Sequence, residues 1–311
     1  MTTAFFEVLG MYVPSENYTE RFYTVRGNEF HQVFQGFPAL APLYMDWEKN
    51  YNAEKVFWFI IDNSWIPWFS LCVYLLFIFG YPALAKRYNI GYISARTQMA
   101  CWNFLLASFS WIGAMRVVPH FFFLLKDVGF EEVLCGAPEP LYGDGAVGFW
   151  IQAFVLSKVA ELLDTVFVVL RQKDPIFLHW YHHVTVLLFT WFTYSNENPG
   201  IIFIAMNYSV HAVMYTYYWL AIVKRVPDWF PTWLITLAQI AQMIVGVFVA
   251  YNYYRVLSSG GSCAVSTDLL WACALMYSTY LYLFCEFAVR RYILGRGNRA
   301  VAAGKGKKKT K

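Results

Sequence analysis

Seven stretches of about 20 mainly apolar residues decide what this chain can fold into. A helix of that length crosses the hydrocarbon core of a bilayer, because each residue adds about 1.5 Å along the helix axis. The sequence therefore predicts an all-α integral membrane protein with seven transmembrane helices. They lie at about residues 65–85, 100–125, 147–170, 176–194, 200–222, 230–254 and 268–289.

The composition excludes the other broad classes of protein. Hydrophobic residues make up 59% of the chain and charged residues only 14%, against roughly 25% charged in a soluble domain. A soluble fold of 311 residues has too much surface to hide so much apolar material, and a disordered chain needs the opposite balance. The segment 290–311 is basic and has no acidic residue, which favours contact with anionic membrane lipid rather than with nucleic acid.

Basic residues are concentrated on one side of the predicted spans. They occur in the connections that carry Lys86, Arg171 and Lys224, and again after the last span. Because basic loops stay in the cytoplasm, we expect the C-terminus to be cytoplasmic and the N-terminus to be lumenal. The chain thus divides into a lumenal N-terminal segment (1–64), a transmembrane domain (65–289) and a basic cytoplasmic tail (290–311).

Two features of the predicted lumenal side concern covalent modification. Cys135 and Cys263 are the two cysteines that lie outside the predicted spans, and both fall on this side. Because the lumen is oxidising, we expect them to form a disulfide, the alternative being two free thiols. Asn17 begins the sequon Asn17-Tyr18-Thr19 and is predicted to be glycosylated, although so short a motif also arises by chance.

The third predicted span carries three ionisable residues at helical spacing. Lys158, Glu161 and Asp164 follow one another every three residues, so they share one face of a helix. A charge inside a bilayer costs several kcal/mol unless it is paired or hydrated, which makes such residues functional candidates. The alternative is a buried ladder of ion pairs that only locks helix packing.

The next three predicted spans carry more polar side chains on single faces. The fourth has His179, His182 and His183 within one and a half turns, and such imidazoles ligate metals, move protons or act as nucleophiles. The fifth and sixth spans add polar side chains spaced three or four residues apart. These are Asn207, His211, Tyr215 and Tyr218, followed by Gln239 and Gln242. In the sixth span, the alternative to a functional site is plain hydrogen bonding between helices.

Three histidines in one box also fit a di-iron desaturase or hydroxylase. Such enzymes need about eight histidines, whereas this chain has six, and His31 and His120 lie away from the others. We therefore expect no metal, and a metal-dependent desaturase or hydroxylase remains the second enzymatic alternative. A proton-coupled transporter is the non-enzymatic alternative, but the sequence has no internal repeat of the kind that many transporters show.

Four motifs in this order resemble those of the ELO family, the very-long-chain fatty acid elongases. They are KVAELLDT (158–165), HWYHH (179–183), HAVMYTYY (211–218) and TLAQIAQ (236–242), and the likeness extends over roughly residues 60–292. The sequence around the histidine box, FLHWYHHVTVLLFTW, looks closest to the subgroup that acts on saturated and monounsaturated acyl-CoA. The resemblance implies seven spans, six of which form a barrel around a narrow acyl tunnel, in the endoplasmic reticulum membrane.

The resemblance also implies an activity and its partners. A long-chain acyl-CoA and malonyl-CoA condense to 3-oxoacyl-CoA, CO2 and CoA, without a cofactor, and side-chain bulk at the lumenal end of the tunnel limits product length. The ketoacyl-CoA reductase, the dehydratase and the enoyl reductase of the same membrane complete the cycle, and a homodimer is compatible with the family. Lys308 and Lys309 resemble a dilysine retrieval signal, although a merely basic tail is the alternative.

The motifs also imply roles for single residues. No cysteine lies among the motifs of spans three to five, so a covalent intermediate has to form on histidine, and the resemblance indicates the central one, His182. Glu161 or Asp164 would orient a histidine, and Lys158 would balance both carboxylates. The other candidates divide by task. Proton transfer and enolate stabilisation fall to His179, His183 and His211, oxyanion and substrate binding to Asn207, Tyr215, Tyr218, Gln239 and Gln242, and CoA phosphates to Arg171, Lys224 and Arg225.

Overall fold

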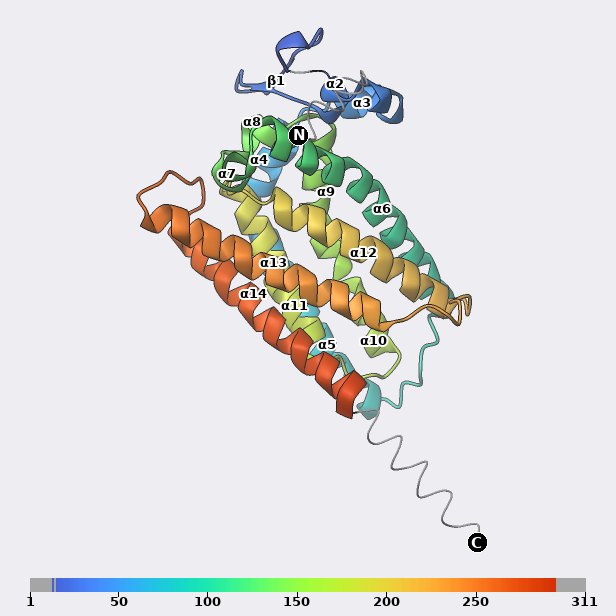
Figure 1. The fold of residues 1–311 in the computed structure, drawn as a ribbon. Coiled ribbons are helices and arrows are strands. Elements are labelled where there is room, and N and C mark those ends of the chain that lie inside the picture. Colours follow the sequence, from blue (N-terminus) through green and yellow to red (C-terminus); the bar gives the residue numbers. More distant parts are fainter. Residues whose placement is uncertain (1–12, 14, 295–311) are drawn as a thin grey trace.

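The computed structural model describes residue 13 and residues 15–294 of the chain. A helix occupies each segment that was predicted to span the membrane, and these helices run side by side in one elongated bundle (Figure 1). In chain order they are α5 (Trp65–Arg87), α6 (Arg96–Asp127), α9 (Gly145–Glu161) with α10 (Leu163–Leu170), α11 (Phe177–Ser195), α12 (Ile201–Ile222), α13 (Trp233–Ser258) and α14 (Thr267–Ala288). Within the bundle, α6 packs along α12, and α13 packs along α14.

Four helices of the described part are long and apolar enough to cross a membrane. They are α5, α6, α13, and α14 together with the π-helical turn η3 (Val289–Leu294). The helices α9 and α10 are shorter, and α11 and α12 carry the histidine, asparagine and tyrosine side chains that lower their hydropathy. The chain is therefore a helical multi-pass membrane protein.

The third predicted helix, over 147–170, is not continuous. It begins at Gly145 and is interrupted at Leu162, which separates α9 from α10. At this point the backbone N–H of Leu162 donates to Val159 (3.4 Å) and that of Thr165 donates to Leu162 (3.3 Å). Hydrogen bonds to the third preceding residue tighten the helix, so side chains after Leu162 are rotated relative to those before it. The expectation of one unbroken face is therefore wrong.

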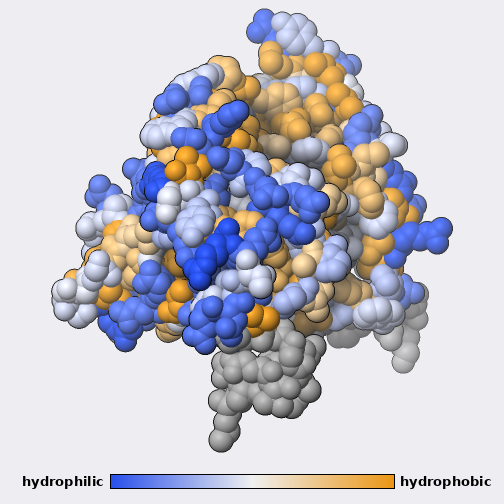
Figure 2. Space-filling model, turned by 90° about the horizontal axis from the view of Figure 1, so that it is seen from above, coloured by the Kyte–Doolittle hydropathy of each residue, from blue (hydrophilic) through white to orange (hydrophobic). Residues whose placement is uncertain are grey.

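An N-terminal cap, here residues 15–62, covers one end of the bundle (Figure 1). A two-stranded antiparallel sheet pairs Phe22 with Phe30 and Tyr23 with Glu29. The elements of the cap are η1 (Ser15–Asn17), β1 (Phe22–Tyr23), β2 (Glu29–Phe30), α2 (Val33–Gly36), η2 (Pro38–Leu43), α3 (Asp46–Lys49) and α4 (Glu54–Asp62). Seen from above, hydrophilic side chains cover much of the centre of this face, and a largely hydrophobic area lies in the upper part of the view (Figure 2).

A buried ion pair fastens the cap to the bundle. Glu48 of α3 is 2% exposed and lies 3.1 Å from the Nη2 atom of Arg116 in α6. Its carboxylate also accepts a hydrogen bond from the indole of Trp150 in α9 (3.1 Å), and the Arg116 guanidinium lies 4.6 Å from the ring centre of Tyr44. Arg116, a charge within a predicted span, thus has its counter-ion in the cap.

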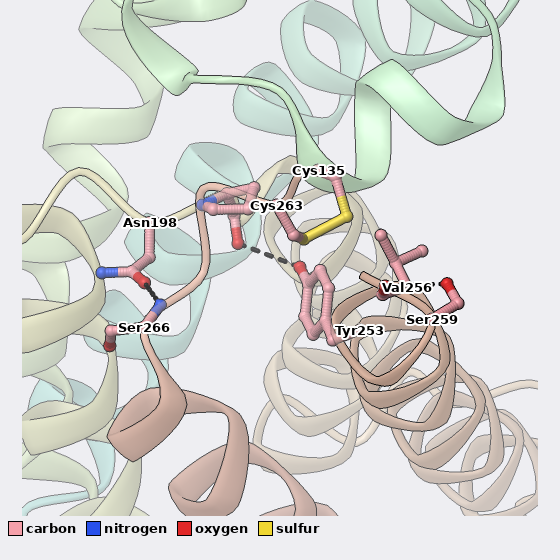
Figure 3. Close-up of a disulfide and its surroundings, with 8 residues drawn as sticks. Cys135, Asn198, Tyr253, Val256, Ser259, Cys263 and Ser266 are labelled. Atoms are coloured by element: carbon pink, nitrogen blue, oxygen red, sulfur yellow. Dashed lines mark hydrogen bonds between the residues drawn. A yellow bond between two sulfur atoms is a disulfide. The ribbon is translucent and has the colours of Figure 1, made fainter. Parts of the chain in front are cut away.

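A disulfide joins two connections at the same end of the molecule. Cys135, the last residue of α7 (Phe130–Cys135), is bonded to Cys263 in the connection between α13 and α14 (Figure 3). Next to it, the side chain of Asn198 accepts a hydrogen bond from the backbone N–H of Ser266 (2.7 Å), and the Tyr253 hydroxyl donates to a backbone carbonyl (3.1 Å). A second short helix, α8 (Pro138–Tyr142), completes this end.

Candidate active site

A cavity of about 750 Å³ lies between α6 and the helices from α10 to α14. We call it the histidine cavity, because all four histidines of the motifs line it. Most of the polar residues predicted from the sequence are brought together around it. They are Asp164, Arg171, His179, His182, His183, Asn207, His211, Tyr215, Tyr218, Lys224, Gln239 and Gln242.

Three predicted site residues do not line this cavity. Lys158 and Glu161 lie in the adjacent part of α9 and contact residues of the cavity wall instead. Arg225 is not part of the wall either, although its neighbour Lys224 is. The interruption at Leu162 accounts for the separation of Glu161 from Asp164, because the two carboxylates no longer belong to one helix.

The three histidines of α11 form a cluster. The ring centres of His179 and His183 are 4.8 Å apart, as expected for residues one helical turn apart, and those of His182 and His183 are 5.6 Å apart. Within the described part of the chain, Nε2 of His179 and Nδ1 of His182 and His183 are buried and have no hydrogen-bond partner. Each buried polar atom without a partner lowers the free energy of unfolding by about 1–3 kcal/mol. Three of them together therefore indicate a ligand-binding site rather than a contribution to stability.

Asn207 determines the tautomer of the fourth histidine. Lys158 is only a donor and donates to Oδ1 of Asn207 (3.2 Å), which turns the amide nitrogen towards His211. That nitrogen donates to Nε2 of His211 (3.2 Å), so Nε2 is the acceptor and Nδ1 carries the proton. Nδ1 lies 4.0 Å from a carboxylate oxygen of Glu161. His211 is therefore hydrogen-bonded at Nε2, while the carboxylate near Nδ1 lies beyond hydrogen-bond distance.

The two carboxylates have different partners. Glu161 pairs with Lys158 (2.6 Å), whereas Asp164 accepts hydrogen bonds from the indole of Trp102 and the hydroxyl of Tyr215, both at 2.7 Å. Among the ion pairs of the described residues, Lys158 therefore balances one carboxylate and not both. A tyrosine hydroxyl has a single proton, so Tyr215 in this arrangement donates to Asp164 and not to an oxyanion.

Sequence reasoning missed several residues of the site. Trp102 of α6 holds Asp164, and the ring of Tyr280 of α14 lies 5.0 Å from that of His182. Tyr92 accepts a hydrogen bond from Arg171 (3.2 Å) near the cavity wall. No local sequence signal could have found them, because each contact joins segments that lie far apart in the sequence.

Basic side chains lie at the end of the histidine cavity that faces away from the cap (Figure 1). Arg96, at the start of α6, Arg171, just after α10, and Lys224, just after α12, all line it. Arg96 donates to the backbone carbonyl of Ile222 (2.6 Å). Arg290 of η3 does not line the cavity and forms an ion pair with Glu286 (2.5 Å). We call this end the basic mouth.

A second cavity, of about 340 Å³, runs from the cap towards the site, and we call it the distal cavity. Its middle is apolar, with side chains such as Ile151, Phe154, Phe189 and Phe203 in its wall. Asn207 lines both cavities, so they lie next to each other at this side chain. The polar site thus lies between a basic mouth and an apolar space.

The remaining predicted positions lie elsewhere. Asn17 is exposed in η1, and Lys308 and Lys309 fall outside the described residues. In the described part of the chain, no three or more histidine, cysteine, aspartate or glutamate side chains are grouped so as to hold a metal ion.

Known proteins resemble this chain over most of its length. The sequence pattern of the ELO family, described as the GNS1/SUR4 family, matches residues 59–300. The chain is 36% identical over 272 residues to "Putative fatty acid elongase 3" of Caenorhabditis elegans, which covers 86% of this chain and 82% of that protein. It is 37% identical over 270 residues to "Very long chain fatty acid elongase 6" of Drosophila melanogaster, covering 84% of each. It is 36% identical over 275 residues to "Fatty acid elongase 1" of Trypanosoma cruzi (strain CL Brener), covering 81% of this chain and 94% of that protein. These matches confirm the resemblance seen in the motifs, and the chain belongs to the ELO (GNS1/SUR4) family.

Proposed function

We propose that this protein is an acyltransferase that catalyses the condensing step of fatty acid elongation. A long-chain acyl-CoA and malonyl-CoA give 3-oxoacyl-CoA, CO2 and CoA. Relatives named fatty acid elongases support the process. The observation that carries the proposal is the position of four histidines between a basic mouth and an apolar cavity. A charged CoA moiety and a hydrocarbon chain need these opposite surroundings on either side of the reacting carbon.

The first step of the proposed mechanism forms an acyl-imidazole. A ring nitrogen of His182 attacks the thioester carbonyl, the carbon–sulfur bond breaks, and CoA leaves with the proton that the other ring nitrogen gives up. The unpaired, buried Nδ1 of His182 supports this role, because a nucleophile needs a nitrogen that no protein group already occupies.

The second step forms the carbon–carbon bond. Malonyl-CoA enters after CoA has left, loses CO2, and its enolate carbon attacks the acyl carbon on His182. The carbon–nitrogen bond breaks, 3-oxoacyl-CoA is released, and the imidazole regains a proton. The rings of His179 and His183 lie 4.8 Å apart next to His182, and they would carry that proton.

The surrounding polar groups position and stabilise the reacting atoms. Asn207 fixes the tautomer of His211, and Glu161, 4.0 Å from Nδ1, would take the place that a carboxylate has beside the histidine of a hydrolytic triad. The Gln239 amide donates to the sulfur of Met214 (3.4 Å), a weak acceptor, so it would be free to turn to the enolate oxygen. Tyr218 and Gln242 complete the substrate wall, and Arg171 and Lys224 would meet CoA phosphates.

The proposed chemistry uses neither a metal nor a cofactor. Imidazole supplies both the nucleophile and the proton carriers, and acyl-CoA and malonyl-CoA are substrates. Activity that survives extensive chelation would support the proposal, whereas loss that only an added ion reverses would contradict it.

We further propose the setting in which the enzyme works. Residues 65–289 would form the catalytic domain in the endoplasmic reticulum membrane, with seven spans, six of which would surround the two cavities. Residues 1–64 would be lumenal and glycosylated at Asn17, and residues 290–311 would be cytoplasmic, with Lys308 and Lys309 as the retrieval signal. The ketoacyl-CoA reductase, dehydratase and enoyl reductase would act on the product, and saturated or monounsaturated chains would be preferred.

The test is incorporation of labelled malonyl-CoA by microsomes that contain the protein, across a panel of acyl-CoAs. We expect 3-oxoacyl-CoA from long-chain substrates, and no product from a variant with both His182→Ala and His183→Ala that accumulates to the same level. Incorporation equal to that of microsomes without the protein, with every acyl-CoA tested, would overturn the proposal.

A further inference from the structure

The end of the distal cavity is formed by the cap. Phe57 of α4 lies in the cavity wall there, and the hairpin residue Arg26 and Glu197, just after α11, are in the wall beside it. Arg26 donates to Glu197 (3.0 Å for one of the two bonds), and its guanidinium lies 5.6 Å from the ring centre of Phe57. The ring of Phe57 is in turn 5.8 Å from that of Tyr194. Phe57 is therefore held between an ion pair and a second aromatic ring.

The surroundings change from apolar to polar at this ring. On one side are the apolar side chains of the distal cavity, such as Phe154 and Phe189. On the other side is the ion pair, whose Arg26 and Glu197 side chains are 48% and 39% exposed. A hydrocarbon chain that grew past Phe57 would leave apolar contacts for solvated charges. Placing two further methylenes there would weaken binding about 15-fold.

The distance along α11 from His182 to the cap end of the distal cavity suits a long acyl chain. Thr193, in the cavity wall next to Tyr194, lies eleven residues after His182 on α11. At about 1.5 Å per residue, this is about 16 Å along the helix axis. An acyl group attached to His182 and extended along α11 would need a long chain to bring its methyl end to Phe57.

We propose that Phe57 stops the methyl end of the acyl chain and so determines the longest product. The inference rests on the proposed function and names the residue that sets its chain-length specificity. Phe57 lies outside residues 59–300, which the family pattern matches, so the limit is supplied by the cap and not by the shared motifs.

The experiment compares product length for variants of two neighbouring aromatic residues. Microsomes with equal amounts of wild-type, Phe57→Ala, Phe57→Trp or Phe59→Ala protein are given saturated acyl-CoAs and labelled malonyl-CoA. We expect Phe57→Ala to accept an acyl-CoA one two-carbon cycle longer than the wild-type limit, with about a tenfold gain in rate on it. Phe57→Trp should shorten the limit by at least one cycle. Phe59 is 46% exposed and not in the cavity wall, so Phe59→Ala should leave the limit unchanged.

The outcomes separate this inference from the proposed function. If the wild type elongates and both Phe57 variants keep its product length, Phe57 is not the stop and the condensing activity stands. Equal lengthening by Phe59→Ala would also overturn the inference, because it would indicate a general loosening of the cap. If Phe57→Ala does not accumulate, Phe57→Leu replaces it with the same expected direction. If no wild-type product forms with any acyl-CoA, the proposed function itself has failed.

Discussion

Lys158 is a charged side chain almost without contact with solvent, since it is 2% exposed. Its Nζ atom lies 2.6 Å from Glu161 and 4.0 Å from the ring centre of Phe154, and it donates to Asn207. A buried pair of this kind gains little net stability, because removing two charges from water costs nearly as much as their attraction returns. We therefore expect the orientation of Asn207 and His211, rather than stability, to depend on it.

This view predicts a different outcome for single and double substitutions. Glu161→Gln leaves the buried ammonium without its counter-ion and should lower the free energy of unfolding by about 3–5 kcal/mol. Lys158→Met should destabilise in the same way through the unpaired carboxylate. The double variant carries no unpaired charge and should recover most of the wild-type stability, measured by thermal unfolding in detergent.

Condensing activity provides the control for that comparison. The double variant should stay at least tenfold below the wild type, because Asn207 no longer has a charged donor that turns its amide towards His211. Stability that falls further in the double variant than in either single one would show that the pair does not act as a unit. Full activity in the double variant would show that the network does not orient His211.

At the scale of elements, the disulfide joins two connections that are 128 residues apart in the sequence. Replacing Cys135 by Ser should destabilise the protein by about 2–5 kcal/mol, because closing so long a loop removes much of the freedom of the unfolded chain. Unfolding in detergent with and without a reductant measures this. The reductant should lower the free energy of unfolding of the wild type to that of the variant and leave that of the variant unchanged. A wild type that is insensitive to the reductant although its disulfide is reduced would contradict the prediction.

Helical periodicity accounts for what could be predicted of the site. Spacings of three and four residues placed the three histidines of α11 on one face, and Asn207, His211, Tyr215 and Tyr218 on one face of α12. All of them line the histidine cavity. Periodicity describes a helix by itself, so it could predict which side chains share a face but not which helix they meet. The contact of Asp164 with Trp102, 62 residues earlier, depends on how α6 packs against α10 and was invisible for this reason.

Two other features could not be predicted for different physical reasons. The interruption at Leu162 lies in a stretch without glycine or proline, and the charged residues around it keep helical spacing, so no local signal marks it. The counter-ion of Arg116 lies in the cap, in a segment whose short elements have no regular period. The helical segments themselves were predictable, because the need for about 20 apolar residues leaves a strong pattern.

At the scale of the whole molecule, the cap and the bundle also meet at a titratable contact. His31, which follows β2, lies 2.8 Å from Asp127 at the end of α6. This hydrogen bond to Asp127 raises the pKa of His31, and Glu29 contributes in the same direction, while burial and Arg21 oppose them. The protonated imidazole is therefore favoured in the folded protein.

The sign of the pKa shift predicts a pH-dependent stability. The contribution of His31 is fully present below the pKa of the unfolded chain, about 6.5, and is lost as the pH rises through the raised pKa of the folded protein. The free energy of unfolding of the wild type should exceed that of His31→Gln by roughly 1 kcal/mol near pH 5.5 and by much less near pH 9. Asp127→Asn, which removes the partner, should show the same pattern. Equal differences at the two pH values would contradict the role of this contact.

The central claim is that His182 carries the acyl group between the two substrates, and intact-mass measurement after incubation with acyl-CoA alone tests it most directly. The account predicts that the wild-type protein gains the mass of one acyl group, that His182→Ala does not, and that malonyl-CoA removes the adduct and yields 3-oxoacyl-CoA. An unmodified wild-type protein together with a His182→Ala variant that still condenses the two substrates would contradict it.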